Sequence, residues 1–443
     1  MPTNLEIPFS YYLAAGLLLL FSVEAVSKMS WSWAIPALMI YLTTGMWYFT
    51  EVIYTPESLV KFNNSILEQG YYQVCIFLIV FRCLLPSITR SIGKYSSQVT
   101  AANWFTLYPH RLLQILMVFW ILLLIYGVSR VNWDISQALF PQGGRWAPQM
   151  WSRAGVGGQT DFIVSAAGYT YALICAMFGV IIFFQRQPQA KLINFFLIII
   201  TWPAFYLSGT RNAFLAVAMP AYMTYILTSR QKWWLKAAIS VGLFMAVNYL
   251  MLIVITLRNT DINAYFQGNA TVSSDTKHLG LNMAEELFYI NKFYEAGKLN
   301  LQYGSEYLAE ALNIIPRFLW PNKPLLGHEY NLLRNPGSGI QATIAAGFIG
   351  RGIMNFGPWF GPVAPAILMS VWAAFLARLW NQRASVLRLG LFLVGLGLTP
   401  NLGRDITLLV LWPMIFGYVV VRYLETIESR RRPKIPNYYY SNR

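Results

Sequence analysis

Apolar runs recur along almost the whole chain, and short polar segments separate them. Each run has about 17–23 residues, which as an α-helix spans a hydrocarbon core of about 30 Å. A transmembrane β-barrel would instead alternate apolar and polar residues over segments of about ten residues. The pattern predicts an all-α, polytopic membrane helix bundle of about eleven spans. They lie near residues 10–27, 31–50, 71–88, 112–129, 162–184, 192–208, 212–228, 235–257, 360–379, 387–401 and 406–424.

One apolar, glycine-rich segment, 340–357, does not fit this series. Counting it as a span would move the basic loop Arg378–Arg388 and the basic C-terminal tail to the opposite face, against the positive-inside rule. Non-helical backbone at membrane depth needs cover from protein or water. We therefore expect 340–357 to be a re-entrant or surface-lying segment that lines a cavity.

Two loops on the outer side are long, a first outer loop at 130–161 and a second at 258–339. In the second loop the stretch 279–312 has helical periodicity, which brings four apolar side chains near one face: Met283, Leu287, Ile290 and Tyr294. The sequence contains no internal repeat. We interpret 1–443 as a single membrane domain with an elaborated outer loop.

The sign of the charges differs from loop to loop. When every second loop is assigned to one side, that side holds 18 Lys and Arg with two acids, against 14 Lys and Arg with 15 acids on the other. This positive-inside pattern predicts an outer N-terminus and a cytoplasmic C-terminus. The net charge of +15 then reflects loops that face anionic lipid, not a nucleic-acid partner. Glu24 and Arg82 lie inside apolar runs and could form a buried pair.

Metal chemistry has little support in the sequence. The cysteines all lie in apolar runs, where we expect them to pack as small hydrophobic residues, and the histidines form no metal-binding motif. These residues are Cys75, Cys83 and Cys175, and His110, His278 and His328. We predict no metal site and no cofactor.

Six cations are expected at or near the outer membrane surface, where the positive-inside rule does not call for them: Arg211, Arg258, Arg317, Lys323, Arg351 and Arg404. Guanidinium groups bind phosphate oxygens in bidentate fashion, so a polyanionic lipid-borne ligand is one explanation. The alternative is that each side chain snorkels to lipid phosphate. For Arg211 and Arg404 the ligand interpretation is favoured, because both turns are too short to need a charged anchor.

Candidate bases are less distinct. His328 and Glu329 follow the segment WPNKP, and Asp405 follows Arg404, where it could instead pair with a guanidinium group. Any of them could accept a proton from a sugar hydroxyl, and each could equally be a surface residue. The remaining acids of the helical stretch are expected to form a solvated face: Glu285, Glu286, Glu306 and Glu310.

With these residues in view, the chain resembles the Wzy-type O-antigen polymerases, or oligosaccharide repeat unit polymerases, a bacterial group related to the O-antigen ligases. The resemblance lies in SGTRNAF around Arg211, PRFLWPNKP around Arg317 and Lys323, GFIGRGIMNFG around Arg351 and NLGRDI around Arg404. It covers the C-terminal half best. Arg351 is a departure, because the resemblance leads us to expect an acid at that position.

The resemblance implies a metal-independent glycosyltransferase of the bacterial cytoplasmic membrane. It would polymerise undecaprenyl-pyrophosphate-linked repeat units on the outer face, for O-antigen, capsule or exopolysaccharide. Arg211, Arg317 and Arg404 would hold the pyrophosphate, with Lys323 and Arg258 as second choices, and His328 or Glu329 would accept the hydroxyl proton. Membrane lipid, a flippase and a chain-length regulator are the further partners it implies.

Two other functions stay open. An O-antigen ligase-like transferase would share the outer cavity but pass the glycan to an acceptor that is not prenyl-linked. A transporter of lipid-linked glycans would have inverted repeats and functional residues near the middle of the membrane. The sequence has no such repeat, and its candidate residues cluster outside.

Overall fold

The computed structural model of the protein describes most of the chain. The described residues are 7–54, 56–94, 109–141, 149–151, 161–207, 211–259, 283–312, 315, 319–322, 327–336, 345–383, 385–404 and 408–431. Within them 82% of residues are helical and none form strands, so the predicted all-α class is confirmed.

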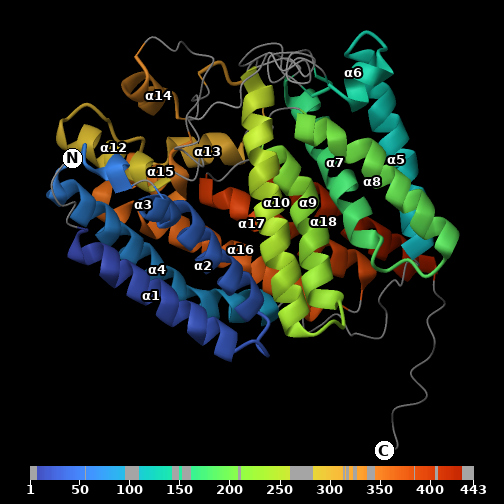
Figure 1. The fold of residues 1–443 in the computed structure, drawn as a ribbon, viewed down its shortest axis with the longest axis horizontal. Helices are drawn as coiled ribbons and strands as arrows, with labels where there is room; N and C mark the ends of the chain where they lie inside the picture. Colours follow the sequence, from blue (N-terminus) through green and yellow to red (C-terminus); the bar gives the residue numbers. More distant parts are fainter. Residues whose placement is uncertain are drawn as a thin grey trace, which may run out of the picture.

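The helices of the N-terminal half are α1 (Phe9–Ser27), α2 (Ala34–Tyr48), α3 (Thr50–Tyr54), the 3₁₀ turn η1 (Pro56–Leu59), α4 (Asn64–Lys94), α5 (Pro109–Ser129), α6 (Ile135–Leu139), α7 (Asp161–Ile181), α8 (Pro188–Leu207) and α9 (Arg211–Thr228). Those of the C-terminal half are α10 (Trp233–Asn259), α12 (Met283–Glu295), α13 (Ser305–Ala311), α14 (His328–Arg334), α15 (Gly347–Phe360), α16 (Val363–Asn381), α17 (Val386–Arg404) and α18 (Leu408–Arg431). Figure 1 shows their arrangement.

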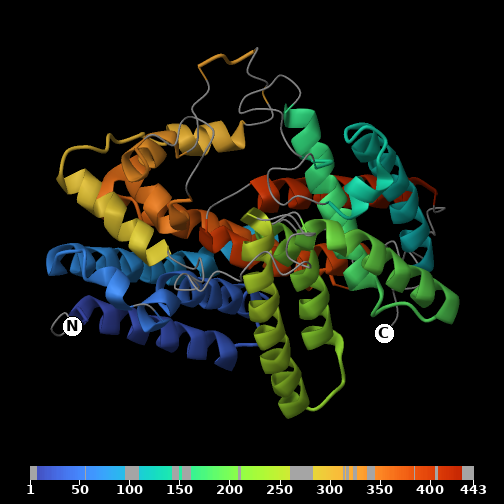
Figure 2. The same ribbon diagram turned by 45° about the horizontal axis from the view of Figure 1, so that its top comes forward.

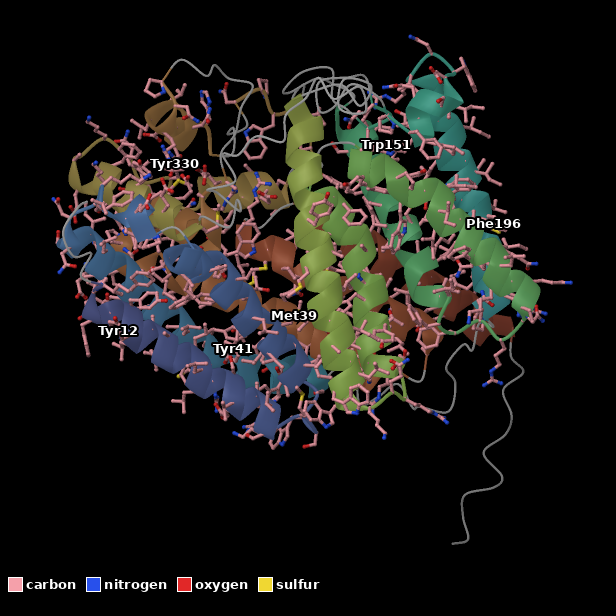
Figure 3. All side chains as sticks on the ribbon, viewed as in Figure 1. Tyr12, Met39, Tyr41, Trp151, Phe196 and Tyr330 are labelled. Atoms are coloured by element: carbon pink, nitrogen blue, oxygen red, sulfur yellow. The ribbon has the colours of Figure 1, made fainter. Side chains whose placement is uncertain are left out.

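Seven of these helices are long and apolar enough to cross a membrane: α1, α4, α5, α7, α8, α16 and α18. Their outward surfaces carry large apolar side chains, such as Tyr12 and Phe196 at opposite edges of the bundle (Figure 3). Exposed apolar surface on this scale suits a lipid environment. The protein is therefore a multi-pass membrane protein. The four other expected spans coincide with α2, α9, α10 and α17, and the total of about eleven remains a prediction.

Helix α17 lies at the centre of the bundle, where almost all of its residues are buried, and it packs against α2, α7, α9, α16 and α18. Small residues permit these close approaches. A side chain at Gly397 would collide with Pro220 of α9, and one at Gly403 would collide with Trp47 of α2. Trp47 also donates its indole N–H to the carbonyl of Pro400, at 2.7 Å. The C-terminal end of α2 is thereby held against the last turns of α17.

The helices α12, α13, α14 and α15 form a cap over one end of the bundle, on the same side in both ribbon views (Figures 1 and 2). Helix α12 packs against α4 and α15. Buried amide groups join α12 to α4, because Gln73 and Asn291 exchange hydrogen bonds of 2.8 and 2.9 Å.

The single helical stretch expected at 279–312 forms two helices, α12 and α13, in the described part. Left-handed backbone at Gly297, Tyr303 and Gly304 separates them.

The described part of the glycine-rich segment 340–357 is the first portion of α15. This helix has 14 residues with non-helical backbone at Gly357, so even unbroken it would extend only about 21 Å at 1.5 Å per residue and fall short of a hydrocarbon core. The backbone N–H of Ile349 donates to the hydroxyl of Tyr48, the last residue of α2, at 3.1 Å. Gly357, with a φ of 81°, bends the chain toward α16. The expectation that 340–357 is a re-entrant or surface-lying segment stays a prediction.

The predicted pairing of Glu24 with Arg82 is confirmed. Both oxygens of the Glu24 carboxylate accept from the Arg82 guanidinium, and Lys28 adds a third contact at 2.6 Å. Cys75 and Cys175 are buried as expected for small hydrophobic residues, whereas Cys83 is exposed on the surface of the bundle.

Candidate functional site: a charged cap over the helix bundle

Helix α12 has two acids, Glu285 and Glu286, in its first turn, next to its apolar face. Met283, Leu287 and Ile290 are buried against the bundle. Glu285 and Glu286 are also buried, with 3% and 4% of their surfaces exposed. The expectation of a solvated acidic face is therefore wrong for this helix. The physical reason is that charged and hydroxyl groups from other chain segments meet these carboxylates and replace water.

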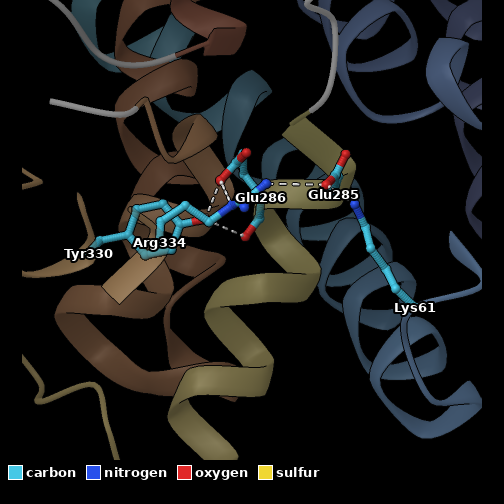
Figure 4. Close-up of polar contacts among 5 residues, drawn as sticks. All are labelled: Lys61, Glu285, Glu286, Tyr330 and Arg334. Carbon is cyan, nitrogen blue, oxygen red and sulfur yellow. Dashed lines mark hydrogen bonds and ion pairs between the residues drawn. The ribbon is translucent and has the colours of Figure 1, made fainter. Parts of the chain in front are cut away.

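The two carboxylates lie between cations from opposite sides, as Figure 4 shows. Lys61, just before α4, pairs with Glu285. Arg334, in the last turn of α14, reaches Glu285 at 3.2 Å and Glu286 at 3.4 Å. The Tyr330 hydroxyl donates to Glu286. We call these five residues the cap cluster, and it ties α14 and the segment before α4 to α12.

Burial changes the acid strength of the cap cluster. Loss of solvent raises the pKa of Glu286 above its ordinary value of 4.5, although the Tyr330 hydrogen bond and the charge of Arg334 act in the opposite direction. Burial, together with the Glu286 carboxylate, raises the pKa of Tyr330 well above its ordinary value of 10.0. At neutral pH Tyr330 is therefore a hydrogen-bond donor, which the carboxylate of Glu286 needs.

The acids of α13 are also buried, and here too the solvated-face expectation is wrong. Glu306 and Glu310 have 5% and 6% of their surfaces exposed. Glu310 pairs with Arg351 of α15 at 3.2 Å. Glu306 accepts the backbone N–H of Gly327 at 2.8 Å and the side-chain N–H of Asn355 at 3.3 Å. These contacts hold α13, α15 and the start of α14 together.

The predicted bases His328 and Glu329 open α14. Glu329 accepts from the backbone and side-chain N–H groups of Asn300, at 3.3 and 2.9 Å, and from the side chain of Gln302. Both carboxylate oxygens are thus engaged in holding α14 to the preceding segment. The Nδ1 atom of His328 is buried and makes no hydrogen bond within the described residues. Of the two side chains, His328 therefore keeps a ring nitrogen without a hydrogen-bond partner among the described residues.

The six predicted cations differ in where they lie in the fold. Arg351 is buried and ion-paired with Glu310, which assigns it a role in packing the cap. Arg404 is the last residue of α17 and is partly buried. Arg211 is the first residue of α9, and Arg258 lies in the last turn of α10. The side chains of Arg211 and Arg258 lie outside the described part of the structure.

Three predicted site residues lie outside the described residues: Arg317, Lys323 and Asp405. Within the part of the chain that the structure describes, no group of three or more His, Cys, Asp and Glu residues is arranged to hold a metal ion.

The sequence reasoning missed three members of the cap cluster, namely Lys61, Tyr330 and Arg334. A signal for two of them was present. Tyr330 and Arg334 are four residues apart, which places both on one face of a helix. An adjacent pair of acids beside an apolar stripe needs hydrogen-bond donors or cations of this kind if it is buried. Lys61 had no comparable signal, because its contact with Glu285 spans 224 positions of sequence.

Comparison with known proteins adds no relative. No family model, no curated protein and no solved structure matches the chain.

Proposed function

We propose that the protein is a membrane glycosyltransferase that polymerises undecaprenyl-pyrophosphate-linked oligosaccharide repeat units on the outer face of the bacterial cytoplasmic membrane. The acceptor hydroxyl oxygen attacks the anomeric carbon of the donor glycan. The bond from that carbon to the pyrophosphate oxygen breaks, and the electron pair leaves with the lipid pyrophosphate. The hydroxyl proton passes to a base. No metal is required, because cationic side chains stabilise the leaving group.

The proposed topology has about eleven spans, an outer N-terminus and a cytoplasmic C-terminus. Basic loops support it, since 18 Lys and Arg would face the cytoplasm. In this topology the cap and the ends of α9 and α17 that carry Arg211 and Arg404 share the outer side. The helices α9 and α17 pack against each other, with Gly397 against Pro220. At 1.5 Å per residue, Arg211 and Arg404 lie about 10–14 Å beyond that contact.

Packing of α17 supports the placement of Arg404 beside the cap. Gly403, its neighbour, abuts Trp47 near the outer end of α2. The next residue of α2, Tyr48, binds the backbone of Ile349 in α15. The end of α17 is therefore linked through α2 to the first turn of α15. A guanidinium at this position meets a ligand that approaches between the bundle and the cap.

In the proposal, Arg211, Arg317 and Arg404 hold the pyrophosphate. Lys323 and Arg258 are second choices, and Arg351 is left out because it already balances Glu310. Each well-placed donor to the developing charge contributes about 3 kcal/mol to transition-state stabilisation. Both oxygens of Glu329 already accept hydrogen bonds, so we assign the base to His328.

The observation that carries the proposal is the cap itself: an ordered set of buried ion pairs that fixes a histidine on the face where the arginine-bearing helix ends emerge. Buried charged groups held in this way occur where proteins bind or transform ligands, as well as in structural networks. A transporter would instead place such groups near the middle of the membrane.

The test uses a strain of the source organism that lacks its own copy of the protein. Such a strain accumulates lipid-linked repeat units and is complemented with Arg211→Ala, Arg404→Ala or Arg383→Ala. Arg383 is a matched control, since it is exposed and stacks on Trp380 at the other end of α16. We expect long-chain polymer from the control and none from the first two variants at equal protein level. Full-length polymer from Arg211→Ala and Arg404→Ala would refute the proposal.

A further inference from the structure

Helix α14 carries the proposed base but is too short to be stable as an isolated helix. It has seven residues, and isolated helices shorter than about 12–15 residues are marginal in water. Its place therefore depends on contacts with other elements. Tyr330 and Arg334 bind the acids of α12. At its N-terminal end, Glu329 accepts hydrogen bonds from Asn300 and Gln302, and Glu306 contacts the residue before His328.

Glu306 holds the residue immediately before the base. Its Oε1 accepts the N–H of Gly327 at 2.8 Å. Gly327 caps α14 with a φ of 65°, a left-handed conformation that sets the direction in which the helix starts. The other oxygen of Glu306 accepts from Asn355 of α15. One buried carboxylate thus fixes the first turn of α14 against both α13 and α15.

We propose that Glu306 is a positioning residue for His328, and this inference rests on the proposed function. Glu306 does not touch substrate. It fixes the peptide N–H at Gly327, and thereby the orientation in which the His328 imidazole meets the acceptor hydroxyl. A displacement of about 1 Å in a reacting group lowers turnover by as much as 100-fold, so loss of this one hydrogen bond is measurable in kcat.

The experiment compares two substitutions of Glu306. Glu306→Gln keeps a carbonyl oxygen that accepts from Gly327. Asn355 can adapt to the new amide, because its Oδ1 accepts no hydrogen bond within the described residues. Glu306→Ala removes the acceptor. Glu68 provides a matched control, since its carboxylate accepts the backbone N–H groups of Phe9 and Ser10 at the start of α1, at 3.0 and 3.3 Å.

The enzyme assay uses full-length protein in lipid nanodiscs and the lipid-linked repeat units that accumulate in the deletion strain. We expect Glu306→Ala to lower kcat about 10- to 100-fold with KM unchanged. Glu306→Gln should keep most of kcat, and Glu68→Ala should lower the melting temperature without lowering kcat. Equal kcat in Glu306→Ala and Glu68→Ala would overturn the proposal, as would a Gln variant that is as slow as the Ala variant.

A second measurement separates this inference from the proposed function. The chain has three histidines, so selective labelling of histidine and a His328→Gln reference assign the imidazole signal of His328 by NMR. We expect that signal to be unchanged in Glu306→Gln and Glu68→Ala, and displaced or split in Glu306→Ala. An unchanged signal in Glu306→Ala refutes positioning by Glu306. If the wild-type protein makes no polymer, the proposed function fails, while the NMR result still decides how His328 is held.

Discussion

Arg334→Met is the perturbation that best separates the cap from the membrane helices. Methionine replaces the unbranched carbon stem of arginine with a similar apolar one but removes the charge that lies between Glu285 and Glu286. Both carboxylates then remain buried, and Glu286 loses its only cation within the described residues. The membrane spans are untouched. We therefore expect the cap to open locally while the bundle stays folded.

The structure sets the size of the effect. Removal of one partner from a buried ion pair destabilises by about 3–5 kcal/mol, because the remaining charge stays buried. The Arg334 side chain is 23% exposed, and Lys61 still neutralises Glu285. Solvent and Lys61 together offset part of the loss, so we expect about 2–3 kcal/mol. At 1.36 kcal/mol per tenfold, this raises the opening equilibrium by about 30- to 150-fold.

Hydrogen exchange measures this opening directly. The amides of Asn331 and Asn335 donate within α14 and its C-terminal turn, each at 2.9 Å. In Arg334→Met they should exchange about 30- to 150-fold faster, while amides of α16 keep their wild-type rates. Arg383→Met, an exposed arginine on the cytoplasmic side of the proposed topology, is the control and should change neither region. Exchange in α14 that is no faster than in this control would show that the cap cluster does not hold the helix.

Three further changes test other parts of the account. Burial raises the pKa of Glu286 above 4.5 in the folded protein, so the unfolded chain binds fewer protons just above that pH. The free energy of unfolding of the cap should therefore fall as pH rises through this window. Glu286→Gln should flatten this pH dependence in urea titrations. Gln73→Leu leaves the buried amide of Asn291 without its partner and should destabilise the protein by about 1–3 kcal/mol. Replacing both Gln73 and Asn291 by leucine should recover much of this loss. Equal melting temperatures for the single and double variants would contradict the pairing. Gly403→Val collides with Trp47 and should lower the amount of folded protein in membranes, whereas a wild-type level would show that the α2–α17 junction is not tight.

The positions of the membrane helices could be predicted because lipid imposes a single strong rule. A helix must be about 20 residues long and apolar to cross the membrane, so hydropathy alone located α1, α4, α5 and α16. The rule weakens for α17. Protein surrounds that helix on nearly every side, and its glycines serve close packing instead of contact with lipid.

The cap could be predicted only in part. Helical periodicity correctly placed Met283, Leu287 and Ile290 on a buried face. The same reasoning failed for Glu285 and Glu286, because burial of a charge depends on partners distant in sequence. Lys61 comes from the segment before α4, and no local pattern connects it to α12. The long-range ion pairs of the cap are therefore a part of this fold that composition and periodicity did not predict.

The candidate site, too, could be predicted only in part from the sequence. The sequence offered His328, Glu329 and Asp405 as candidate bases alike. In the structure both oxygens of Glu329 accept hydrogen bonds that hold α14, and this is why the proposal assigns the base to His328. Arg351 was predicted to bind substrate on the basis of its outer location. Its contact with Glu310 assigns it instead to the packing of α13 against α15.

The most direct test of the central claim is reconstitution of the purified protein in lipid vesicles that contain only the lipid-linked repeat units from the deletion strain. The account predicts longer lipid-linked glycans together with one released undecaprenyl pyrophosphate for each bond formed, without any added metal or second type of acceptor. Release that requires a different acceptor, or vesicles in which the repeat units stay unchanged, would contradict it.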